Sequence, residues 1–71
     1  MSTILTNEEK SGIVSQHIKN VEYSLYNLNL SLIEENAVSS PDADKISSLN
    51  DQIADLDAQK SALQTELANL A

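Results

Sequence analysis

Residues 46–70 read ISSLNDQIADLDAQKSALQTELANL, and their apolar residues recur at alternating intervals of three and four. This is the period of the a and d positions of a coiled coil, which share one face of an α-helix. The a and d series consists of Ile46, Leu49, Ile53, Leu56, Lys60, Leu63, Leu67 and Leu70. Only Lys60 is polar. A helix is predicted over residues 41–70, because Pro41 suits the first helical position and Ser40 precedes it.

Another helix is predicted upstream, over residues 7–37. Thr6 and Glu9 have the spacing of a capping box, in which each side chain bonds the backbone N–H of the other residue. Apolar residues then follow at intervals of four and three, and we call them the first stripe. The first stripe comprises Val14, Ile18, Val21, Leu25, Leu28 and Leu32. Residues 1–6 form an N-terminal arm, which we expect to pack against a neighbouring molecule.

A β-strand is the competing interpretation for residues 26–32, where apolar and polar residues alternate. The helix is preferred because leucine is not β-branched and because Asn27 and Asn29 disfavour a strand.

Two long helices joined by a short turn, predicted at residues 38–40, pack antiparallel. Facing residues of an antiparallel pair have numbers with a constant sum. A sum of 81 sets the first stripe against the a and d series, with Leu32 opposite Leu49. The tip then lies between Ser40 and Pro41, at the break inferred independently from the proline. The fold class predicted is therefore all-α, an antiparallel two-helix hairpin of coiled-coil type over residues 7–71.

The upstream helix carries further apolar residues, which we call the second stripe. The second stripe comprises Tyr23, Tyr26, Leu30, Ile33 and Ala37. It too fits the downstream helix, with a sum of 79, which would turn the first stripe outward. In either register one stripe has no partner within the hairpin, and contiguous exposed apolar surface usually marks an interaction site. We expect a homo-oligomer, either a dimer forming a four-helix bundle or a trimer of hairpins.

The composition also favours self-association. A chain of 71 residues builds a marginal core and usually needs a disulfide, a metal or association. With no cysteine and one histidine, neither a disulfide nor a zinc site is indicated. A net charge of −7 opposes binding to nucleic acid or anionic membrane, and no apolar run could span a bilayer. We expect a protein of the cytoplasm or one packed into an assembly.

Three polar features are candidate sites. Lys60 could specify register and oligomeric state, or its stem could pack while its ammonium group reaches Asp57 or Glu66. His17 borders the first stripe and is interpreted as an ordinary boundary residue. The third feature is a group of acids near the tip: Glu34, Glu35, Asp42 and Asp44. They lack the glycine-centred loop of an EF-hand and are interpreted as a solvated acidic tip with Lys45 as counter-charge.

No catalytic constellation is present. The serines have no base partner in a recognisable pattern, and no glycine-rich loop could cradle phosphate. The sequence therefore predicts neither an enzyme nor a protein that binds a cofactor or small molecule.

Three segments carry a resemblance to small uncharacterised proteins of contractile-tailed phages of marine cyanobacteria. The segments are residues 5–10, 16–20 and 31–38, which read LTNEEK, QHIKN and SLIEENAV. The stretch from the first of these segments to the last covers about half of the chain. The resemblance implies a viral origin and a place in the virion, but no site residues.

The function expected is that of a structural or assembly protein that associates with itself and with other structural proteins. The alternative is an acidic helical binding module, an inhibitor or adaptor that docks another protein through its unpartnered stripe.

Overall fold

The first helix, α1 (Asn7–Asn36), begins at the capping box that the sequence predicts. Thr6 Oγ1 accepts the Glu9 N–H at 3.1 Å, and Glu9 Oε1 accepts the Thr6 N–H at 2.9 Å. The helix continues to Asn36, one residue short of the predicted end. It contains residues 26–32, so the strand considered for that segment is wrong.

The second helix, α2 (Ala43–Asn69), begins two residues after the predicted start at Pro41. Asp42 is the N-cap, and its carboxylate accepts the N–H groups of Asp44 and Lys45 at 3.0 and 3.2 Å. The carboxylate of an aspartate accepts hydrogen bonds from the free N–H groups at the start of a helix, whereas a proline side chain cannot accept any. Pro41 therefore precedes the cap, and the connection between the helices spans residues 37–42 instead of 38–40.

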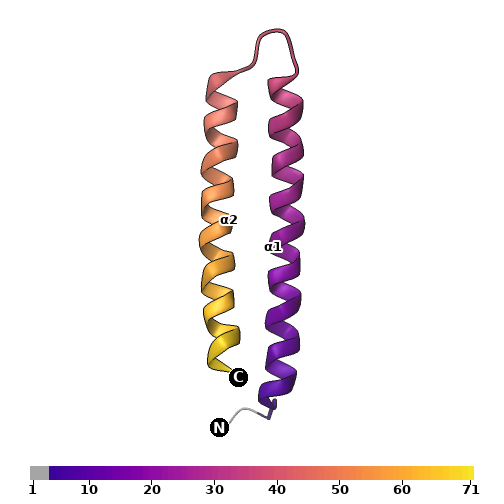
Figure 1. The fold of residues 1–71 in the computed structure, drawn as a ribbon, viewed down its shortest axis with the longest axis vertical. Coiled ribbons are helices and arrows are strands. Elements are labelled where there is room, and N and C mark those ends of the chain that lie inside the picture. The colour runs from indigo at the N-terminus through magenta and orange to yellow at the C-terminus, as the bar shows by residue number, and fades with distance from the viewer. Residues whose placement is uncertain (1–3) are drawn as a thin grey trace.

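The two helices lie side by side and antiparallel in the computed structural model, which describes residues 4–71 (Figure 1). The rod that they form measures 56 × 20 × 14 Å. Two ion pairs between the helices report the register. Lys60 pairs with Glu22 and Lys45 pairs with Glu35, so that the residue numbers sum to 82 and 80. These values bracket the predicted sum of 81.

The first stripe faces the a and d series of α2, and it supplies the core. Its members are half-buried, as are those of α2, and Leu49 is the one buried side chain among the described residues, with 8% exposed. The register with a sum of 79 is wrong for a physical reason. The second stripe begins at Tyr23, so that register would set Leu63 and Leu67 against Gln16 and Gly12 and leave the end of α2 without apolar partners.

Part of the N-terminal arm lies outside the described residues, namely residues 1–3. Ile4 and Leu5 are exposed, and their packing against a neighbouring molecule stays a prediction. Neither described helix is long and apolar enough to cross a membrane.

Candidate protein interface

The second stripe lies on the outer side of α1. The exposed fractions are 61% for Tyr23, 66% for Tyr26, 64% for Ile33 and 37% for Leu30, and Ala37 is exposed as well. Single exposed apolar residues are ordinary on a protein surface, but a row of large ones along one helix face is not. This row is the strongest candidate for an interface in the described part of the chain.

Helical geometry directs the second stripe away from α2. Each residue turns the chain by about 100° around the helix axis. If the first stripe occupies positions a and d, the second occupies b and f. The centres of the two stripes are then about 150° apart around the axis of α1. A partner that covers Tyr26 and Ile33 therefore lies on the side of α1 opposite α2.

Lys19 extends the second stripe by one turn toward the N-terminus. Its Nζ lies 5.9 Å from the centre of the Tyr23 ring. This is the range of a cation–π contact, which at an exposed site contributes about 0.5–1 kcal/mol. The stripe therefore has a cationic end at Lys19 and an apolar end at Ala37.

The outer face of α2 differs in character. Its b and f positions hold only small or polar residues: Ser47, Asp51, Ala54, Ala58, Ser61, Thr65 and Ala68. In the described hairpin, large apolar side chains therefore form a continuous outer row on α1 and not on α2.

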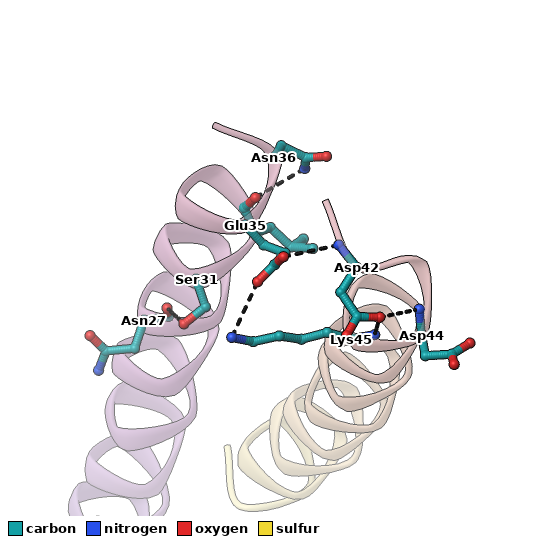
Figure 2. A network of polar contacts seen from close by, with 8 residues as sticks. Asn27, Ser31, Glu35, Asn36, Asp42, Asp44 and Lys45 are labelled. Atoms are coloured by element: carbon teal, nitrogen blue, oxygen red, sulfur yellow. Dashed lines mark hydrogen bonds and ion pairs between the residues drawn. The ribbon is translucent and has the colours of Figure 1, made fainter. Parts of the chain in front are cut away.

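The acidic residues at the tip act separately. Glu35 lies between the helices, where it accepts the Asp42 backbone N–H at 3.0 Å and pairs with Lys45 at 3.2 Å (Figure 2). Its side chain is only 13% exposed, which corrects the interpretation of a solvated tip at this residue. Asp42 caps α2, and no group of three or more acidic or histidine side chains within residues 4–71 is arranged to hold a metal ion.

Glu35 could have been identified from its position in the repeat. It follows Leu32 by three residues and thus continues the a and d series of α1, which directs it toward α2. The bond from the Asp42 N–H, and then the Lys45 ammonium group, lower the pKa of the Glu35 carboxyl group.

Glu35→Gln tests this contact through its pH dependence. Because the pKa is lowered in the folded chain, the carboxylate stabilises the hairpin at pH values above 4.5, the ordinary pKa of a glutamate. This contribution disappears as the pH falls through the lowered pKa. We expect Glu35→Gln to melt below the unmodified chain at pH 7, with the gap closing in acid. Thermal melts by circular dichroism at both pH values measure the gap, and a gap that persists unchanged in acid would contradict the assignment.

Lys60 forms an ion pair with a residue other than the two partners expected for it. Its Nζ lies 3.4 Å from Glu22 Oε2 on α1, instead of near Asp57 or Glu66 on its own helix. The side chain of Lys60 is 30% exposed, as expected when the stem packs and the charge reaches solvent. Glu22 follows Val21, the residue predicted opposite Lys60, so the register alone could have identified it.

Lys60→Leu is expected to raise the melting temperature by roughly 4–8 °C, the shift that about 1 kcal/mol produces in a domain of this size. Leucine would fill the a position against Val21, whereas the partly exposed ion pair that is lost contributes little. Sedimentation of the same variant should give an unchanged mass, because Lys60 faces the inside of the hairpin. An altered mass would instead support a role in specifying the oligomer.

His17 is exposed on α1 beside the first stripe, as expected for a boundary residue.

Comparisons with known proteins add no assignment, because no family model, curated protein or solved structure matches this chain.

Proposed function

We propose that this chain is a structural or assembly protein that associates with copies of itself through the second stripe. The observation that carries the proposal is the exposure of Tyr23, Tyr26 and Ile33 in one row along α1. The core within the hairpin contains a single buried side chain, Leu49. A chain with so little internal burial gains stability when a second copy removes further apolar surface from water.

The size of the exposed row suits a modest interface. A tyrosine buries about 150–250 Å² when fully covered, so the large side chains of the second stripe offer roughly 500 Å² per copy. Two copies with their flanking polar residues would bury about 1,000–1,400 Å² in total, at the lower end of specific interfaces. We therefore expect association at micromolar concentration.

Because residues 5–10, 16–20 and 31–38 resemble segments of phage proteins, we include a virion among the assemblies proposed. Other structural proteins of such an assembly are proposed as further partners.

Sedimentation equilibrium at micromolar concentration, alongside helicity by circular dichroism, tests the proposal. A helical species with a mass that is a multiple of 7.7 kDa supports it. A poorly helical monomer contradicts it and favours the alternative, an acidic inhibitor or adaptor that becomes ordered when the second stripe meets a different protein.

A further inference from the structure

The polar residues beside the core limit how two hairpins can combine. A closed four-helix bundle needs a third apolar column on each helix, at the e or g positions next to a and d. On α2 these positions hold Lys45, Asn50, Gln52, Asp57, Gln59, Gln64 and Glu66, and on α1 they hold Ser15, His17, Glu22, Ser24, Asn29, Ser31 and Asn36. Every one is polar. On the two described helices, large exposed apolar side chains are therefore available to a second copy only on the outer side of α1.

Two copies of the second stripe have complementary spacing when they pack antiparallel. With a residue-number sum of 56, Tyr23 faces Ile33 of the partner subunit and Tyr26 faces Leu30 of the partner subunit. The same pairs recur on the other side of a two-fold axis that passes beside residue 28. Each tyrosine thus meets an aliphatic side chain, and a large residue faces a large one at every step of the central row.

Charge favours this direction as well. The last turn of α1 has no basic residue, although Glu34 and the negative end of the helix dipole lie there. The antiparallel arrangement brings the partner's Lys19 beside this turn, opposite Ala37. A parallel arrangement in register would instead set Lys19 against the partner's Lys19.

The residues that flank the second stripe are compatible with the same pairing. Residues that flank the stripe meet the same flank of the partner, at sums of 54 on one side and 58 on the other instead of 56. Asn27 and Asn29 therefore each lie beside their own counterpart, where amide groups can donate and accept hydrogen bonds mutually. Farther out, Glu34 lies opposite Asn20 of the partner subunit, and Glu22 lies opposite Asn36 of the partner subunit. In a chain with a net charge of −7, this register sets no two carboxylates against each other.

We propose that two copies of this hairpin pair antiparallel along the second stripe of α1, forming an open layer in the order α2, α1, α1, α2. This inference rests on the proposed self-association and adds its direction, register and shape. The α1 helices overlap over residues 20–36, about 24 Å at the rise of an α-helix. Because the axis lies nearer the tip than the termini of the 56 Å rod, the dimer extends to about 75 Å.

Crosslinking tests the direction, because the chain has no cysteine and single thiols can be introduced cleanly. Asn20→Cys and Glu34→Cys proteins are mixed and treated with a short bis-maleimide, and the covalent dimers are identified by intact mass. We expect the product that joins positions 20 and 34 to form a several-fold larger fraction of the covalent dimers than it does when the same mixture is crosslinked in denaturant. Products that join 20 to 20 or 34 to 34 in excess would show a parallel pair and overturn the proposal.

A matched pair on α2 provides the control. Ser47→Cys and Ser61→Cys have the same separation of 14 residues and lie on the outer face of α2. The proposed layer leaves this face of α2 exposed. The three possible crosslinked dimers of the two variants should therefore form in the same ratio as in denaturant. Preferred crosslinking between them would place α2 at the interface and overturn the layer.

Sedimentation and small-angle X-ray scattering of the unmodified chain complete the test. A dimer with a maximum dimension near 75 Å supports the layer. A dimer no longer than the single 56 Å rod, or a trimer, overturns the layer but leaves the proposed self-association standing. A monomer overturns both.

Discussion

Replacing Leu49 with alanine is expected to unfold most of the chain at room temperature. Leu49 is the one buried side chain in residues 4–71, and the register with a sum of 81 sets it opposite Leu32. A buried Leu→Ala change costs about 2–5 kcal/mol. A two-helix core is marginal even when intact, so a loss of this size removes most of its stability.

Helicity and thermal melting by circular dichroism measure the loss, at one fixed protein concentration because association contributes to stability. Leu70→Ala is the matched control. It deletes the same atoms from a half-buried d position at the C-cap of α2, and helix ends contribute less to stability because they tend to fray. We expect it to lower the melting temperature less than half as much. Equal losses in the two variants would show that the core is not centred at Leu49.

Replacing Tyr26, Leu30 and Ile33 together with serine is expected to abolish self-association while leaving a helical hairpin. These side chains point away from α2 and contribute little to the core of the single chain. Each substitution removes buried apolar area on both copies of a dimer. At about 25 cal/mol per Å², the three together reduce the free energy of association by more than roughly 3 kcal/mol. The dissociation constant should therefore rise at least about a hundredfold.

Sedimentation equilibrium should then give the mass of one chain, 7.7 kDa, at concentrations where the unmodified chain is associated. The control replaces Ala54, Ala58 and Ala68 on the outer face of α2 with serine. It introduces the same number of residues with weaker helix propensity, but it should leave the mass unchanged. An unchanged mass in the first variant would show that the second stripe is not the interface.

Local sequence patterns sufficed for most of the fold. The period of the apolar residues determined that both helices form, because a repeat of three and four residues places side chains on one face only in a helix. Thr6 and Glu9 marked the start of α1 because a capping box is complete within four residues. The start of α2 was missed by two residues because Pro41 and Asp42 satisfy competing rules for helix starts, and the aspartate side chain is the stronger partner for free amides.

The members of the candidate interface were predictable, but their direction was not. Both stripes of α1 have the same spacing, so no local rule distinguishes the register with a sum of 81 from that with a sum of 79. Likewise, the contacts of Glu35 with Lys45 and of Glu22 with Lys60 join residues far apart in the chain.

The amino-acid pattern is enough to predict two amphipathic helices, their antiparallel packing and one apolar stripe more than a hairpin can bury. Which stripe lies outside becomes clear only when the two helices are packed together. The physical reason is length: the first stripe matches the a and d series of α2 from end to end, whereas the second stops at Tyr23 and would leave Leu63 and Leu67 in water.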